Sequence, residues 1–285
     1  MTVQNVGILH PGAMGIFVAV SAQNSGNTVY WVSQGRGPQT RARADKYNLS
    51  DAKTLAELCE ICVVIVSVCP PAAAEEVARQ VLAHSFKGLY LDANAISPQR
   101  AIRIGQAMRG GGARFVDWGI IGGPSWDAGK TWLYLSGEDA EEAAACFSEG
   151  PIQPRVIGKS VGKASALKMC YAAYNKGATA LLCAVLATAQ ALDVRNELEA
   201  QWSEDSSKLA EQAKEKTRRV TAKAWRFAGE MDEIASTFRE AGLPGEFHTA
   251  AAMIYRRMAG FKDAPTMPAL DQVLQVLIET SDGDS

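Results

Sequence analysis

The sequence predicts a doubly wound α/β domain followed by an all-α domain, and three observations predict it. Short apolar runs alternate with Ala- and Glu-rich helical stretches through the first half of the 285 residues. A turn with the spacing Gly12-x-x-Gly15 follows the first apolar run. The second half opens on a long Ala- and Leu-rich stretch, residues 160–193, with no proline and few charges. Crossover helices around a parallel sheet explain the first pattern, and a helical domain explains the last.

The apolar runs of the first half are expected to form parallel strands. They are continuous instead of alternating, as expected for strands buried on both faces. The expected strands are Asn5–Leu9, Thr28–Val32, Ile61–Val68, Gly88–Asp92, Arg114–Trp118 and Trp132–Ser136. Helices are expected between them, for example over 72–83 and 98–109, and no strand is expected after Ser136.

The domain boundary is expected where Pro151, Pro154 and Gly158 cluster, so the predicted domains are 1–158 and 159–285. Residues 160–193 are expected to form one long interdomain helix that leads the second domain. That helix is apolar on most faces and must be buried on most sides. In a chain of this length, such burial favours a domain-interlocked homodimer. A charged helical pattern continues from 197 to 261 with a break at 242–245.

Composition excludes several classes of protein. The formal net charge is −2, which favours neither a nucleic acid nor an anionic membrane surface as a partner. Neither an 18-residue apolar run nor a signal pattern occurs, so a cytoplasmic protein is expected. The cysteines are scattered, with one C-x-x-C spacing and no histidine cluster, so we expect buried free thiols and no metal: Cys59, Cys62, Cys69, Cys146, Cys170 and Cys183.

The turn after the first strand is typical of a dinucleotide-binding (Rossmann) unit, in which a helix N-terminus receives a pyrophosphate. Gly12 would let the backbone approach the phosphates, and Gly15 would let the helix pack on the strand. His10 replaces the first glycine of the G-x-G-x-x-G pattern, and Pro11 stiffens the turn. An ordinary strand-to-helix turn is the alternative. We expect the cofactor to contact His10, Pro11, Gly12, Ala13 and Met14.

The end of the second strand indicates which nucleotide would bind. An acid at this position binds the ribose 2′-hydroxyl and repels a 2′-phosphate, but the sequence has Ser33 there, followed by Arg36, Arg41 and Arg43. A guanidinium group binds phosphate through paired, charge-assisted hydrogen bonds. NADP(H) is therefore predicted, with Ser33 and Arg36 at the 2′-phosphate. The alternative is that the arginines lie on a solvated loop.

Five segments form an ordered set of motifs: His10–Gly15, Val68–Pro71, Asp92–Pro98, Asp117–Gly123 and Gly162–Lys168. Together they resemble the β-hydroxyacid dehydrogenase superfamily, which includes 3-hydroxyisobutyrate dehydrogenase, 6-phosphogluconate dehydrogenase and the imine reductases. The resemblance covers roughly residues 3–260. It is greatest to the 6-phosphogluconate-dehydrogenase-like branch whose C-terminal domain has no assigned function.

The resemblance implies roles for residues of these motifs. Lys168 would be the catalytic general acid/base, and Tyr171 and Asn175 would replace the family's asparagine, which is Ala172 here. The loops after two strands would add the cofactor contacts Val68, Cys69, Pro70 and Asn94. The substrate would contact Asn94, Ala95, Trp118, Ile120, Ile121, Gly122 and Lys168.

Departures from the family motifs bear on the substrate. Ile121 and Asn94-Ala95 replace hydroxyl residues that help to hold a substrate carboxylate in the family, which disfavours a small hydroxy acid. Trp118 and Trp126 suggest a more apolar pocket. The expected reaction is hydride transfer between NADPH and a small carbonyl or alcohol, because a lysine among apolar residues can exchange a proton near neutral pH.

Two alternative functions stay open. The first is an imine reductase, because Tyr171 and Tyr174 follow Lys168 on the helix. The second is a non-catalytic, NADPH-binding regulatory protein.

Overall fold

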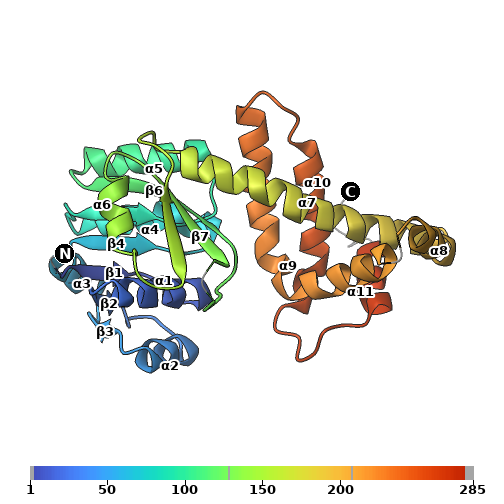
Figure 1. Cartoon of the computed structure of the whole chain (residues 1–285), viewed down its shortest axis with the longest axis horizontal. Coiled ribbons are helices and arrows are strands. Elements are labelled where there is room, and N and C mark those ends of the chain that lie inside the picture. The colour runs from blue at the N-terminus through green and yellow to red at the C-terminus, as the bar shows by residue number, and fades with distance from the viewer. Residues whose placement is uncertain (1–2, 128, 207, 280–285) are drawn as a thin grey trace. The chain divides into compact units, whose positions relative to one another are not determined.

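The computed structural model describes residues 3–127, 129–206 and 208–279. The chain forms two compact units, residues 1–169 and 170–285 (Figure 1). The first unit contains the sheet and the second is helical, so the predicted fold class is confirmed. The first unit continues beyond residue 158 into the start of a long helix, because that helix is hydrogen-bonded to the sheet.

The strands of the described residues form one sheet in the order β3-β2-β1-β4-β5-β6-β7-β8. They are β1 Asn5–Ile8, β2 Thr28–Trp31, β3 Ser50–Asp51, β4 Val64–Ser67, β5 Leu89–Asp92, β6 Arg114–Ile121, β7 Thr131–Ser136 and β8 Ile152–Val156. β1 to β6 are parallel, β7 is antiparallel to β6, and β8 is parallel to β7. The order 3-2-1-4-5-6 is that of a dinucleotide-binding sheet, with the topological switch point between β1 and β4.

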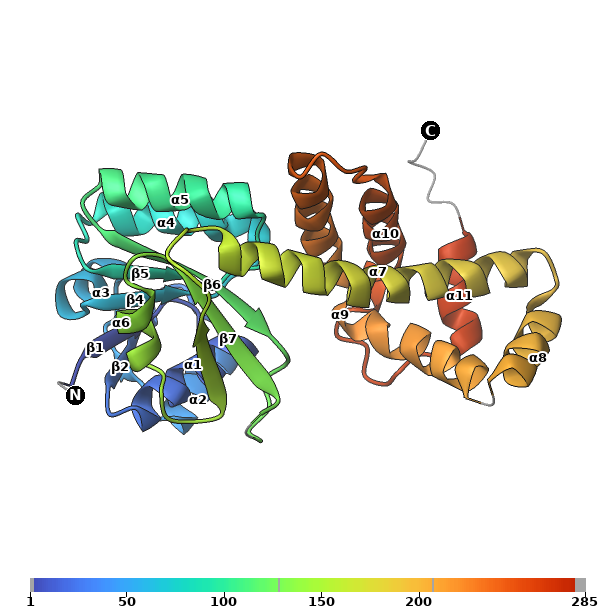
Figure 2. The same ribbon diagram turned by 45° about the horizontal axis from the view of Figure 1, so that its top comes forward.

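Helices cover both faces of this sheet. They are α1 Ala13–Asn24, α2 Pro38–Lys46, α3 Leu55–Ile61, the 3-10 turn η1 Pro71–Ala73, α4 Ala74–Ala83, α5 Pro98–Gly110 and α6 Ala140–Ala145. Side chains of α1 and α6 pack in one apolar cluster with the strands, and those of α3, α4 and α5 pack in another. Figure 2 shows α4 and α5 together on one side of the sheet. Burial on both faces explains the continuous apolar pattern of the strands.

The prediction of no strand after Ser136 is wrong. Residues Ile152–Val156 form β8 at the edge of the sheet, in register with β7. Pro154 lies within β8 and weakens the strand pattern in the sequence. An edge strand accepts proline because one side of it carries no ladder hydrogen bonds. The short strand β3 was also not predicted, and the expected strand from Ile61 begins only at Val64, because Ile61 ends α3.

The long helix predicted over 160–193 is α7, Lys163–Ala191. The second unit contains most of it together with α8 Arg195–Asp205, α9 Leu209–Glu240, α10 Glu246–Arg257, η2 Met258–Phe261 and α11 Leu270–Ile278. The predicted break at 242–245 separates α9 from α10, and α11 was not predicted. In the part of the chain that the structure describes, no helix combines the length and apolarity needed to cross a membrane.

Candidate cofactor and active site

The glycine turn lies at the switch point of the sheet, between the end of β1 and the start of α1. The Gly12 amide donates to the His10 carbonyl at 2.8 Å. A Cβ at Gly15 would lie 2.0 Å from the His10 carbonyl oxygen, so only glycine fits there. At Gly12 the φ of −72° suits any residue, and a Cβ would meet no atom within 4 Å. Gly12 therefore leaves open space at the α1 N-terminus, where a phosphate group would bind.

His10 places an imidazole in this turn. Its burial, and secondly the positive charge of Arg36, lower the pKa of His10 to about 4, so the ring is neutral at pH 7. The Nδ1 atom is buried and has no hydrogen-bond partner in the described structure. Buried nitrogens are nearly always hydrogen-bonded in folded proteins. This orphaned atom is consistent with a ligand that completes the turn.

The three predicted arginines lie around the turn. The described residues provide none of them with a carboxylate in a salt bridge, so their charge is not neutralised locally. Burial lowers the pKa of Arg36. Their guanidinium groups donate to backbone carbonyls: Arg36 to Leu9 at 3.1 Å, Arg41 to Ser33 at 2.7 Å and Arg43 to Pro11 at 3.1 Å. Ser33 itself is buried. The cluster is suited to an anionic ligand.

Asn94 joins the loops that follow β4 and β5. Its Oδ1 accepts the backbone N–H of Cys69 at 2.6 Å, and its Nδ2 donates to Ser67 Oγ at 3.1 Å. Asn94 is buried, whereas Val68, Cys69 and Ala95 are half-buried and Pro70 is exposed. Both ends of the Asn94 carboxamide are therefore hydrogen-bonded within the protein. The solvent-accessible surface of these two loops belongs to the residues next to Asn94.

Lys168 lies on α7 at the carboxyl end of β6, the same edge of the sheet as the glycine turn. Its Nζ donates to the Ile120 carbonyl at 2.6 Å. Gly119 permits this approach, because a Cβ there would lie 2.6 Å from the Ala164 carbonyl oxygen. A residue with a side chain at 119 would push the first turns of α7 away from β6.

Asp117 fixes the start of α7 on the sheet. Its carboxylate accepts the backbone N–H groups of Gly162 at 2.9 Å and Ser165 at 3.0 Å, and the Ser165 hydroxyl at 2.6 Å. It also accepts the Ser136 hydroxyl at 3.1 Å. Ser165 lies in the first turn of α7 and Gly162 directly precedes it, so Asp117 binds backbone N–H groups that have no partner within the helix. Asp117 opens the motif Asp117–Gly123, and no role was predicted for it from the sequence.

The predicted substrate residues of β6 lie on both faces of the sheet. Asp117 and Gly119 face α7, so Trp118 between them faces the other side, because strand residues alternate. Trp118 is fully buried against Phe147, with ring centroids 4.8 Å apart, and has no exposed surface for a substrate. Ile120 and Ile121 are buried, and Gly122 is exposed with a φ of +116°.

Trp126 packs edge-on against Phe17 of α1, with ring centroids 5.4 Å apart. It is half exposed, and it stacks on Tyr47 with ring centroids 5.5 Å apart.

Tyr171 and Asn175 lie on α7 within the second unit. Tyr171 is 49% exposed, and Asn175 Nδ2 donates to the Tyr171 carbonyl at 2.9 Å. Lys176, one residue further, was not predicted to have a role. It forms an ion pair with Glu230 of α9, and both side chains are largely buried.

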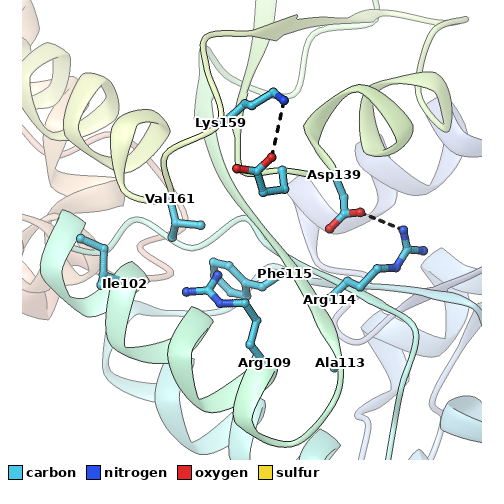
Figure 3. Close-up of a pocket in the computed structure, with 9 residues that line it drawn as sticks. Ile102, Arg109, Ala113, Arg114, Phe115, Asp139, Lys159 and Val161 are labelled. Carbon is cyan, nitrogen blue, oxygen red and sulfur yellow. Dashed lines mark hydrogen bonds and ion pairs between the residues drawn. The ribbon is translucent and has the colours of Figure 1, made fainter.

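A hollow of about 450 Å³ lies at the opposite, amino end of β6 (Figure 3). Its charged groups are largely paired with each other, since Arg114 contacts Asp139 at 3.0 Å and Lys159 contacts Glu138 at 3.6 Å. It is lined by Ile102, Arg109, Ala113, Arg114, Phe115, Glu138, Asp139, Lys159 and Val161. Because Lys168 and the glycine turn are at the other edge of the sheet, this hollow is not part of their site.

The cysteines are all free, but they are not all buried as predicted. Cys170 is exposed on α7, and Cys59 and Cys69 are half-buried. Burial raises the pKa of Cys59 to about 11 and that of Cys62 to about 12, so the C-x-x-C pair holds unreactive thiols. Within 3–127, 129–206 and 208–279, no group of three or more His, Cys, Asp or Glu side chains could hold a metal ion.

Comparison with known proteins agrees with this architecture. Residues 5–146 match the NAD binding domain of 6-phosphogluconate dehydrogenase, and residues 189–258 match a domain of unknown function, DUF1932. The fold and the glycine turn thus define a nicotinamide-dinucleotide-binding protein. The first unit belongs to the NAD-binding domains of the 6-phosphogluconate dehydrogenase family.

The individual proteins similar to this chain share only a minority of its residues. An uncharacterized 28.5 kDa protein from Methanothermus fervidus is 31% identical over 166 residues, which are 58% of this chain and 63% of that protein. A solved conserved protein of unknown function, described as similar to 3-hydroxyacid dehydrogenases, is 26% identical with a TM-score of 0.65. That match covers 90% of this chain and 97% of the other.

Two further solved structures share the fold. The 3-hydroxyisobutyrate dehydrogenase of Mycobacterium tuberculosis, solved with L-serine, has a TM-score of 0.70 at 15% identity and covers 98% of this chain and 100% of its own. An imine reductase from Myxococcus stipitatus, in complex with NADP+, has a TM-score of 0.57 at 15% identity. That match covers 96% of this chain and 100% of the reductase.

Proposed function

We propose that the protein is an NADPH-dependent oxidoreductase that transfers hydride between the nicotinamide and a small carbonyl or alcohol substrate. Lys168 acts as the general acid/base. One observation carries this proposal: the Lys168 ammonium group lies at the same edge of the sheet as the open space at Gly12, hydrogen-bonded to the Ile120 carbonyl at 2.6 Å. A proton donor and a phosphate-binding turn at one edge are what a hydride-transfer enzyme requires.

The proposed cofactor is NADP(H). The residues that would hold it are the turn from His10 to Met14, with Gly12 open toward the α1 N-terminus, and the loop residues Val68 to Pro70. Arg36, whose charge no described carboxylate neutralises, would bind the 2′-phosphate beside Ser33. The bound cofactor supplies the hydride chemistry. The protein binds and orients it.

The role proposed for Lys168 follows from its surroundings. The Ile120 carbonyl holds Nζ, and the close packing of α7 at Gly119 fixes the lysine stem. During reduction, Nζ donates a proton to the substrate oxygen as negative charge develops there; during oxidation, the neutral amine accepts that proton. Ile120, Ile121, Gly122 and Ala95 are the proposed substrate contacts of the first unit, and Tyr171 and Asn175 are proposed positioning residues.

The proposed active form is an interlocked homodimer. Large apolar and aromatic side chains of α7 are exposed in the single chain: Leu167, Tyr171, Tyr174 and Leu181. Their exposed fractions range from 37% at Leu167 to 78% at Tyr174. Apolar exposure along one helix indicates a protein–protein contact. We propose that a second copy covers it and helps to form the active site.

Imine reduction is the second candidate reaction. The exposed phenol groups of Tyr171 and Tyr174 lie one and two turns after Lys168 and could donate a proton instead. A third possibility, a non-catalytic NADPH-binding regulatory protein, would be favoured by tight NADPH binding without turnover of any aldehyde, ketone, hydroxy acid or cyclic imine.

The substitution Lys168→Met tests the proposal. It should lower turnover by about 10²–10⁴-fold, the range for general acid catalysis, and leave NADPH affinity nearly unchanged. The matched control is Lys163→Met, an exposed lysine at the start of the same helix, which should keep full turnover. Near-normal turnover of a well-folded Lys168→Met protein on carbonyl substrates would refute the role of Lys168 and favour Tyr171 or Tyr174.

A further inference from the structure

Asp92 is a buried acid at the carboxyl end of β5 that the proposed chemistry leaves without a role. It is 1% exposed and lies opposite Asp117 in the register of β5 and β6. Its Oδ1 accepts the backbone N–H of Asn94 at 3.0 Å, while Oδ2 is buried without a hydrogen-bond partner in the described structure. A buried carboxylate oxygen without a partner is uncommon and needs an explanation.

Groups from three elements act on the charge of Asp92. Its burial, the largest effect, raises the pKa of Asp92 to about 7, and Asp117 of β6 raises it as well. Hydrogen bonds from Asn94 and the positive charge of Arg100 on α5 act in the opposite direction. Asp92 therefore changes charge near neutral pH, where most carboxyl groups remain ionised.

Three neighbouring titratable groups change charge outside the range from pH 6 to 8. Tyr90, two residues earlier on the same face of β5, is fully buried, and its pKa is raised well above the usual value. Burial raises the pKa of Cys69 to about 11, and the pKa of His10 in the glycine turn is about 4. Burial also raises the pKa of Asp117, but four hydrogen bonds to its carboxylate act in the opposite direction. The pKa of Asp92 lies within the range from pH 6 to 8.

Asn94 connects Asp92 to the loop after β4. Its backbone N–H is bound by Asp92, and its carboxamide is bound to Cys69 and Ser67. In a sheet of this order, the strands from β4 onward form the half that receives the second mononucleotide. The position of Asn94 thus affects the loop next to the expected nicotinamide.

We propose that Asp92 is an ionisable positioning residue of the cofactor site: its carboxylate form orients Asn94, and Asn94 holds the loop after β4 in the arrangement that receives the nicotinamide half. The inference rests on the proposed function, since it requires a nicotinamide dinucleotide at this edge. A carboxylate accepts a stronger hydrogen bond from the Asn94 N–H than a neutral carboxyl group does. Cofactor binding therefore strengthens as Asp92 loses its proton.

The test is the dissociation constant of NADPH between pH 6 and 8, measured by fluorescence titration. For the unmodified protein, affinity should increase about three- to ten-fold over this range, the difference between a neutral and a charged hydrogen bond. Asp92→Asn keeps the shape of the side chain but not its charge and should remove this increase. The 2′-phosphate of NADPH also titrates near pH 6, but it contributes to both proteins, so the difference between the two curves isolates Asp92.

A second variant, Asn94→Ala, keeps the ionisable carboxyl group but removes its link to the loop. It should weaken NADPH binding and make it independent of Asp92, while the pH dependence of thermal stability remains. That stability falls as pH rises from about 4 to about 7, because the folded state retains a proton that the unfolded chain loses. The substitution Asp92→Asn should remove the decrease in thermal stability that Asp92 causes over this pH range.

The outcomes distinguish the inference from the proposed function. An unchanged pH dependence of NADPH affinity in either folded variant would overturn the positioning role of Asp92. If circular dichroism shows that Asp92→Asn does not fold, the pH dependence of NADPH affinity in Asn94→Ala is the test of the positioning role. Failure of the unmodified protein to bind NADPH at any pH would instead refute the proposed function.

Discussion

The two glycines of the turn should respond differently to the same substitution. In Gly12→Ala the new methyl group would meet no protein atom within 4 Å, and the φ of −72° suits alanine. Alanine lowers the entropy of the unfolded chain, which stabilises by about 0.4–1 kcal/mol, and is a poorer helix N-cap than glycine, which opposes this gain. The free energy of unfolding should therefore change by less than about 1 kcal/mol.

Cofactor binding should nevertheless be lost in Gly12→Ala. The methyl group would occupy the open space at the α1 N-terminus, where the pyrophosphate is expected. We expect NADPH affinity to fall at least about 100-fold, or about 2.7 kcal/mol. Titration calorimetry measures the affinity, and differential scanning fluorimetry on the same samples measures the melting temperature.

Gly15→Ala is the matched comparison. Its Cβ would lie 2.0 Å from the His10 carbonyl oxygen, so β1 and α1 must move apart. Overpacking of this kind costs about 1–3 kcal/mol, which should lower the melting temperature by roughly 2–12 °C in a unit of this size. Normal NADPH affinity in folded Gly12→Ala would refute the assignment of this turn to the phosphates, and unchanged stability of Gly15→Ala would refute the packing argument.

Two further predictions concern the cofactor and the assembly. NADPH should bind at least ten-fold more tightly than NADH, about 1.4 kcal/mol, and Arg36→Ala should remove most of this preference; equal affinities in the unmodified protein would contradict the assignment. Light scattering at micromolar concentration should give twice the 30.5 kDa mass of the chain. Leu181→Glu, at an exposed position of α7, should give a folded monomer, and a monomeric unmodified protein would contradict the proposed dimer.

The sequence alone predicted the features that depend on local pattern. The strand–turn–helix at Gly12 and Gly15, the α/β alternation and the α7 helix each depend on residues close together in the chain. Strands buried on both faces require continuous apolar runs, and a turn next to a packed helix requires glycine. The doubly wound sheet was predicted, but the strand order at the switch point is known only from the structure.

Only the tertiary structure decided which side chains lie together. Trp118 was expected at the substrate, but one position along β6 determines whether a side chain faces α7 or the opposite core, and motif spacing does not reveal this. β8 was missed because Pro154 disrupts its pattern, although pairing with β7 stabilises it. The links of Asn94 to Cys69, of Lys168 to Ile120 and of Asp92 to Asp117 join different strands and helices. Hydrogen bonds and charge interactions depend on distance in space, which the chain acquires only by folding.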